Sequence, residues 1–194
     1  MDIAPGPSGS ILFDVQDRTR LPVTPAGRMF FPAQDPWKGL ELWSSDGTLA
    51  GTRCAHDIFA GPAWGIPFRG SWDAALIGSN VVFAAYDGID GTEPWLSDGT
   101  SAGTFRIKDL APRGSSSSPA GFITLGSVVC FWADDAVVGG EPWVTNGTAA
   151  GTVLLADIVP NGGYSSPPPR AVVNGRLVFA AGDYLTGVEL WGTN

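Results

Sequence analysis

Eight acidic residues recur at fixed positions and are the first candidates for chemistry. Four times, an aspartate is followed four residues later by a glycine, then by a glutamate, and a tryptophan stands two residues after that glutamate. Such carboxylates could bind a cation or act as a catalytic acid and base. The residues are Asp35, Asp87, Asp135 and Asp183, then Glu41, Glu93, Glu141 and Glu189, then Trp43, Trp95, Trp143 and Trp191.

The repetition favours a structural role for these residues. A catalytic acid and base need two different environments, which four equal copies do not supply. We expect each indole to fill space between neighbouring sheets, while the carboxylate two residues before it meets a turn amide or a neighbouring side chain. We expect each aspartate to brace its loop by accepting hydrogen bonds from amides two residues on. One carboxylate per repeat is too few for a calcium ion, so the sequence predicts no metal site. It also predicts no catalytic residue and no cofactor.

The remaining reactive side chains are few. His56 stands beside Asp57, but no Gly-x-Ser-x-Gly segment accompanies them, and we expect a solvated histidine at a strand end. Cys54 and Cys130 fall in different strands of different repeats, which predicts two small apolar fillers and no disulfide.

Three tryptophans lie outside the repeated positions. Trp37 falls in the loop between two strands, and Trp64 and Trp72 fall in the connection to the next repeat. Binding residues collect in loops, and exposed aromatic rings suit stacking on sugars or on the apolar surface of a protein. The three are therefore the candidate ligand-binding residues, with the alternative that each fills a local gap.

The repeats must position these side chains, and their pattern predicts four short strands each. The tryptophans recur about every fifty residues, as in the blades of a propeller. A Phe-x-Ala pair precedes each aspartate, which places both side chains on one strand face. Asp46-Gly47, Asp98-Gly99 and Asn146-Gly147 predict hairpin turns in which both residues take positive φ. With 27 glycines and 16 prolines and no long helical stripe, the chain is predicted to be all-β.

The segment Glu41-Leu42-Trp43-Ser44-Ser45-Asp46-Gly47-Thr48 resembles the bacterial ELWxxDGT repeat, also called hyalin-like. Together with its other copies, the resemblance covers nearly the whole chain. Pro94 and Pro142 replace leucine in later copies, and Asn146 replaces aspartate. The resemblance implies a repeat module of secreted or cell-surface bacterial proteins that forms a propeller and has no generally assigned activity. Secretion or surface display is thus an expectation from the family resemblance alone, because Met1–Gly6 has neither the basic n-region nor the apolar h-region of a signal peptide.

We predict one propeller domain over residues 1–194, with repeats at 2–56, 57–108, 109–156 and 157–194 and an incomplete last blade. Met1–Pro5 resembles the end of a fourth strand, and Asn194 coincides with the start of a turn. Three interpretations stay open: a four-bladed ring with a thin blade, a fragment of a longer array, and a half-ring completed by association. Further repeats would complete the ring if the chain is a fragment, and copies of the chain would complete it if the chain is a half-ring.

Composition narrows the partners. A net charge of -8 argues against a nucleic-acid partner, and no apolar run is long enough to insert into a membrane. We predict a non-enzymatic binding or scaffold module with a protein or carbohydrate ligand. The alternatives are a carbohydrate-active enzyme that uses two rim carboxylates about 5 to 9.5 Å apart, and a self-assembling structural module.

Overall fold

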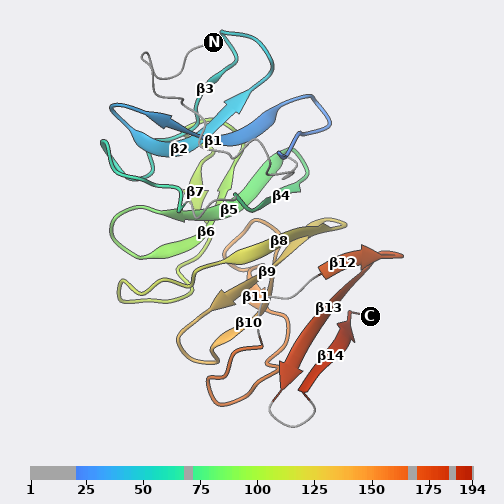
Figure 1. Ribbon diagram of the computed structural model, residues 1–194. Helices are drawn as coiled ribbons and strands as arrows, with labels where there is room; N and C mark the ends of the chain where they lie inside the picture. Colours follow the sequence, from blue (N-terminus) through green and yellow to red (C-terminus); the bar gives the residue numbers. More distant parts are fainter. Residues whose placement is uncertain (1–20, 68–71, 166–169, 184–186, 194) are drawn as a thin grey trace.

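The computed structural model is all-β and describes residues 21–67, 72–165, 170–183 and 187–193, of which Asp183 is described by its backbone alone. Four antiparallel sheets of three, four, four and three strands follow one another in chain order from one end of the molecule to the other (Figure 1). Sheet 1 contains β1 Met29–Asp35, β2 Gly39–Ser45 and β3 Arg53–Cys54. Sheet 2 contains β4 Ala74–Ile77, β5 Asn80–Tyr86, β6 Thr92–Ser97 and β7 Phe105–Arg106.

The last two sheets repeat the same order of strands. Sheet 3 contains β8 Ala120–Leu125, β9 Val128–Asp134, β10 Gly140–Thr145 and β11 Val153–Leu154. Sheet 4 contains β12 Arg170–Val173, β13 Arg176–Asp183 and β14 Gly187–Gly192. In each sheet the strands pair with their neighbours in sequence, so each is a meander joined by short loops. The prediction of an all-β chain built from four small antiparallel sheets is confirmed.

Each sheet has a column face, which carries the repeated Phe, Ala, Glu and Trp side chains, and a reverse face. The register pairs the phenylalanine with the tryptophan and the alanine with the glutamate, as in Phe83 with Trp95 and Ala85 with Glu93. Directly paired residues lie on the same face of a sheet, so these four side chains form one patch. All eight phenylalanines and alanines of the column are buried: Phe31, Phe83, Phe131, Phe179, Ala33, Ala85, Ala133 and Ala181.

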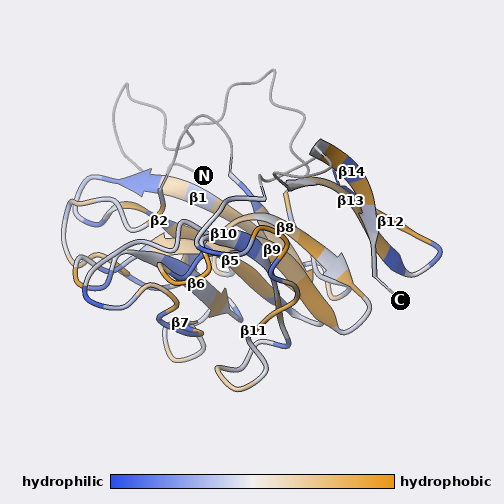
Figure 2. Cartoon of the chain, turned by 90° about the horizontal axis from the view of Figure 1, so that it is seen from below, coloured by the Kyte–Doolittle hydropathy of each residue, from blue (hydrophilic) through white to orange (hydrophobic). Residues whose placement is uncertain are grey.

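The sheets pack face to face, and the contact is the same at each junction. The reverse face of one sheet packs against the column face of the next. Phe30 and Leu42 of sheet 1 thus lie in one cluster with Phe83 and Trp95 of sheet 2. Figure 2 shows the hydrophobic strands lying against one another in the interior. The core is therefore a series of three apolar layers.

The two ends of the series differ. On the column face of sheet 1, Phe31 and Trp43 are 3% and 9% exposed and contact Leu21 and Met29. On the strand β14 of sheet 4, every residue is exposed, including Glu189 and Trp191. The expectation that each tryptophan fills space between neighbouring sheets is therefore wrong for Trp43, whose face is covered by Leu21 and Met29 rather than by another described sheet, and for Trp191. The physical reason is that no described residue covers β14.

The turns after the tryptophans differ from the prediction. Gly47, Gly99 and Gly147 have positive φ, but the preceding Asp46, Asp98 and Asn146 do not. The side chain of the first residue explains this: Asp46 Oδ1 accepts the backbone N–H of Thr48 at 2.9 Å and its hydroxyl at 2.7 Å. Hydrogen bonding to its own loop holds the aspartate in an ordinary conformation, and the loop runs on to the next strand at Arg53. No helix long and apolar enough to span a membrane occurs among the described residues.

Candidate functional site

The glutamates of the first three sheets are completely buried and are occupied by backbone amides. Glu41 accepts hydrogen bonds from the N–H groups of Ile58, Phe59 and Gly65 at 3.1 to 3.2 Å. Glu141 accepts from Ile158 at 3.2 Å and from Val159 at 3.0 Å. The donors belong to the connection that leads to the next sheet, and of these five amides only that of Gly65 also has a backbone acceptor, the carbonyl of Leu40 at 3.1 Å. Each carboxylate therefore anchors a connection to its own sheet.

Glu93 is bound in the same way. It accepts from the N–H of Leu110 at 2.9 Å, and from the N–H and the hydroxyl of Ser117 at 3.0 and 2.7 Å. Burial raises the pKa of Glu93, and it raises the pKa of Glu41 to about 8, although the N–H donors act in the opposite direction. These carboxyl groups are enclosed by protein and have their oxygens turned to the chain.

The aspartates at the ends of the second strands form loop braces. Asp35 Oδ1 accepts the N–H groups of Trp37 and Lys38 at 2.8 and 3.0 Å. Asp87 binds the N–H groups of residues 89 and 90, and Asp135 those of residues 137 and 138, in the same arrangement. The fourth aspartate, Asp183, ends β13, and its side chain lies outside the described part of the chain. Each brace fixes a tight loop at one end of a sheet.

Each braced loop of the first three sheets presents an exposed apolar side chain, and of these three the sequence predicted only Trp37 as a candidate. The residue two positions after each aspartate is Trp37, Ile89 or Val137, with exposed fractions of 72%, 75% and 78%. The aspartate accepts the backbone N–H of that same residue, so the brace fixes the backbone from which the exposed side chain projects. Alignment of the four copies would have found this position. We call this end of the sheets the loop rim.

The connections between sheets contribute a second exposed position to the loop rim. Trp64 is 47% exposed and Tyr164, the corresponding residue after sheet 3, is 64% exposed. Backbone contact brings the two loops together: a Cβ on Gly39 would lie 1.6 Å from the carbonyl oxygen of Ala63. Trp37 and Trp64 therefore project from two loops that touch each other.

Trp72 requires a correction. It is 3% exposed and belongs to the core cluster between sheets 1 and 2, so its ring offers no face for stacking on a ligand. A signal in the sequence could have shown this. Trp72, Ala74 and Leu76 alternate with period two at the start of sheet 2, and the two later residues pack on the same cluster.

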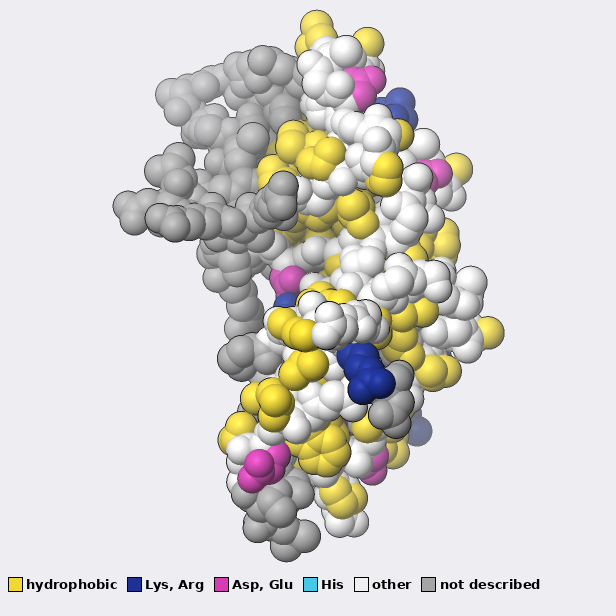
Figure 3. Space-filling view, turned by 90° about the vertical axis from the view of Figure 1, so that its right-hand side faces the viewer, with side chains coloured by type: hydrophobic (Ala, Val, Ile, Leu, Met, Phe, Trp, Pro, Cys, Tyr) yellow, Lys and Arg dark blue, Asp and Glu magenta, His cyan; other side chains and the backbone are white. Residues whose placement is uncertain are grey.

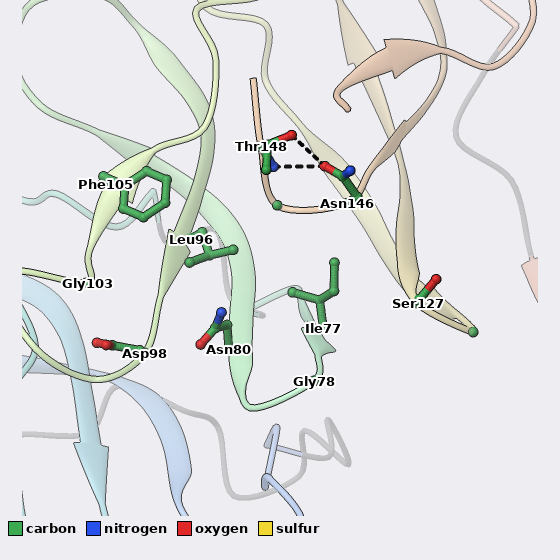
Figure 4. A pocket seen from close by; sticks show the side chains of 12 residues that line it. Ile77, Gly78, Asn80, Leu96, Asp98, Gly103, Phe105, Ser127, Asn146 and Thr148 are labelled. Atoms are coloured by element: carbon green, nitrogen blue, oxygen red, sulfur yellow. Dashed lines mark hydrogen bonds between the residues drawn. The ribbon is translucent and has the colours of Figure 1, made fainter. Parts of the chain in front are cut away.

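A groove of about 700 Å³ opens at the opposite end of the sheets, between sheets 2 and 3. Figure 4 shows Asp98 and Phe105 on one side of it and Asn146 and Thr148 on the other. Asn146 Oδ1 is already bonded to the N–H and the hydroxyl of Thr148 at 3.0 and 2.7 Å. Part of the polar lining of the groove is thus already hydrogen-bonded within the turn.

The single histidine and the two cysteines belong neither to the loop rim nor to the lining of the groove. Nδ1 of His56 lies 2.7 Å from the hydroxyl oxygen of Ser101, which links sheet 1 to the turn of sheet 2. Cys54 and Cys130 are free thiols, and burial raises the pKa of each to about 11. Across the described ranges, no three His, Cys, Asp or Glu side chains gather as a metal site would require.

Comparison of the chain with protein-family models, with curated proteins and with solved structures gave no match.

Proposed function

We propose that the protein is a non-enzymatic binding module, that its four sheets are blades of a β-propeller, and that the loop rim binds a carbohydrate. The propeller is supported by the repeated meander and by the same face-to-face contact at three successive junctions. The resemblance to the ELWxxDGT repeat agrees with this fold and with secretion or surface display.

One observation carries the ligand proposal. Trp37 and Trp64 are exposed by 72% and 47% on loops that are held in contact at Gly39 and Ala63. A sugar ring buries its apolar face on an aromatic ring, and two rings on fixed loops lose little conformational freedom when the ligand binds. Lys38, beside Trp37, adds a hydrogen-bond donor at the same loop.

The buried carboxylates support a binding role rather than catalysis. Glu41, Glu93 and Glu141 are 0% exposed and use their oxygens to bind backbone amides. A carboxyl group that acts on a glycosidic bond must reach the substrate from a cleft. These three glutamates therefore serve the scaffold that presents the loop rim.

A glycan array followed by calorimetric titration tests the proposal. We expect a glycan to bind the wild-type protein, and Trp37→Ala and Trp64→Ala each to weaken its binding at least tenfold. Phe105→Ala is the matched control, because Phe105 is 44% exposed but lines the groove at the opposite end. Binding that is lost in the control and kept in the tryptophan variants would move the site to the groove, and a blank array would refute a carbohydrate ligand.

A further inference from the structure

The groove between sheets 2 and 3 has a counterpart between sheets 1 and 2, where arginine side chains bridge the two sheets. There, Arg53 Nε donates a hydrogen bond to the carbonyl oxygen of Gly99, in the turn of sheet 2, at 3.2 Å. Ser44 Oγ donates to the same oxygen at 3.3 Å and accepts a hydrogen bond from Arg28 Nη1 at 3.1 Å. One guanidinium group thus binds the turn of the next sheet directly, and a second binds it through a hydroxyl.

The groove has the same framework. Gly147 in the turn of sheet 3 and Gly99 have φ values of 88° and 87°, and the N–H of each donates to a hydroxyl two residues before it. A Cβ added to Gly99 would lie 2.9 Å from Ser44 Oγ. One added to Gly147 would lie 2.8 Å from Cδ1 of Leu96, which holds the position of Ser44 in its sheet. The same turn in the same place directs the carbonyl of Gly147 toward sheet 2.

The two arginines are replaced at the second junction. By register, Phe105 holds the position of Arg53. Asn80, three residues before the phenylalanine of the column face, holds the position of Arg28. Within the described part of the chain, no group donates a hydrogen bond to the carbonyl of Gly147. The groove of about 700 Å³ therefore opens where the first junction has arginine side chains.

The lining suits a guanidinium group (Figure 4). Ile77 and Leu96 offer apolar surface for the stem of an arginine side chain, and the ring of Phe105, which is 44% exposed, can stack on its planar head. Asp98 is the only charged residue among the twelve that line the groove. The chain has a net charge of -8, and Figure 3 shows only scattered Lys and Arg side chains on the face that it views. Little positive charge therefore opposes a cationic ligand.

We propose that this groove binds an arginine side chain of a peptide segment, with the guanidinium group donating to the carbonyl oxygen of Gly147. Arginine fits better than lysine, because its planar head carries five N–H donors and stacks on an aromatic ring. The groove has the volume of sites that hold drug-sized ligands, so a peptide segment fills it better than a free guanidinium ion. The loop rim lies at the opposite end of the sheets, so this proposal is independent of the carbohydrate site.

NMR titration of the whole ¹⁵N-labelled chain tests the proposal, with acetyl-Gly-Arg-Gly-amide as the probe. A titration to about 10 mM covers the weak affinity of a single side chain. We expect the probe to shift the amide signals of Gly147, Thr148 and Phe105. Acetyl-Gly-Lys-Gly-amide, which has the same charge without the planar head, should bind about tenfold more weakly. Methylguanidinium, which lacks the peptide and the stem, should also bind about tenfold more weakly.

Two variants return a guanidinium group to the groove from the chain itself. Phe105→Arg and Asn80→Arg place an arginine at the positions that Arg53 and Arg28 hold in sheet 1, and each should abolish the shifts by filling the groove. Val153→Arg is the matched control, because Val153 holds the same position in sheet 3, is 47% exposed and does not line the groove. Well-dispersed amide signals show that each variant is folded.

Loss of the shifts in the two filling variants, with the shifts kept in Val153→Arg, supports the proposal. Absence of shifts in the wild-type protein overturns it, and so does equal affinity for the lysine peptide or for methylguanidinium. Shifts that persist in both filling variants overturn it as well, because the peptide would then lie elsewhere. Loss of the shifts in Val153→Arg would show that added positive charge alone repels the probe, which also contradicts a specific site.

Discussion

Replacing Glu141 by glutamine tests the central role given to the buried glutamates. The carboxylate accepts two backbone N–H groups, one on each oxygen, at 3.2 and 3.0 Å. Glutamine has nearly the same shape but only one oxygen, so one of the two amides must face an NH2 group. Glu141 is 0% exposed, and water cannot replace the lost acceptor.

The magnitude follows from that geometry. A buried donor left without an acceptor costs about 1 to 3 kcal/mol. We therefore expect Glu141→Gln to lower the free energy of unfolding by about 2 kcal/mol. For a chain of this length, that corresponds to a fall in Tm of about 4 to 8 °C. Glu141→Leu leaves both amides unpaired and should cost about twice as much.

The fourth copy of the repeat supplies a matched control. Glu189 occupies the same position in β14 but is exposed. Glu189→Gln should change the free energy of unfolding by less than about 0.5 kcal/mol. The comparison holds the chemical change constant and varies only the surroundings of the carboxylate.

Urea unfolding of the three variants measures the free energies, and native-state hydrogen exchange locates the effect. In Glu141→Gln, amide protection should fall at Ile158 or Val159, the two donors, and stay unchanged at Ile58 in the first connection. If Glu141→Gln and Glu189→Gln unfold at the same urea concentration, the buried carboxylate does not hold the connection to its sheet.

Three further predictions concern the backbone, the core and the thiols. Gly39→Ala should cost about 1 to 3 kcal/mol more than Gly47→Ala, because both glycines have positive φ but only Gly39 abuts a backbone carbonyl; equal urea midpoints would contradict this. Trp72→Ala should lower the free energy of unfolding by about 3 to 5 kcal/mol and Trp37→Ala by less than about 0.5, since only Trp72 is buried; a differential scanning calorimeter would reveal the opposite order. Burial raises the pKa of Cys130 to about 11, so its thiol should stay protonated and react slowly with a disulfide reagent at pH 8, faster as the pH approaches 11, and at once in urea. Rapid labelling of both thiols, Cys54 and Cys130, in the folded protein at pH 8 would show that Cys130 is accessible.

The strands could be predicted because all four copies of the repeat place the same residue types on the same strand face. Phe83 and Ala85 gave the column face through their spacing alone, and their register with Trp95 and Glu93 agrees with it. Repetition averages out the local exceptions that mislead a single strand. The same repeats supported the aspartate braces, since an aspartate before a glycine loop can reach amides within its own loop.

The turns and Trp72 could not be predicted by the same means. The pair Asp46-Gly47 predicts a two-residue turn, but Asp46 accepts the N–H of Thr48 and the loop closes further on through a hydrogen bond between the hydroxyls of Ser45 and Thr52. By contrast, Asn174-Gly175 joins β12 to β13 with φ values of 52° and 75°, the tight turn that such a pair favours. A dipeptide signal therefore holds only where no neighbouring hydroxyl offers another arrangement. The alternation of Trp72 with Ala74 and Leu76 indicates a buried strand face, but only the structure shows that sheet 1 is what covers it.

The residues that recur in every repeat have structural roles, and the repeated glutamates are therefore poor candidates for ligand binding. A connection that crosses from one sheet to the next has backbone amides without strand partners, and burying them requires an acceptor inside the protein. The repeated glutamate supplies that acceptor, so its oxygens are committed to Ile58 and Phe59 in one copy and to Ile158 and Val159 in another. A ligand must then be recognised by side chains that vary between copies. Trp37 and Trp64 vary in this way on loops that the repeated residues hold in place.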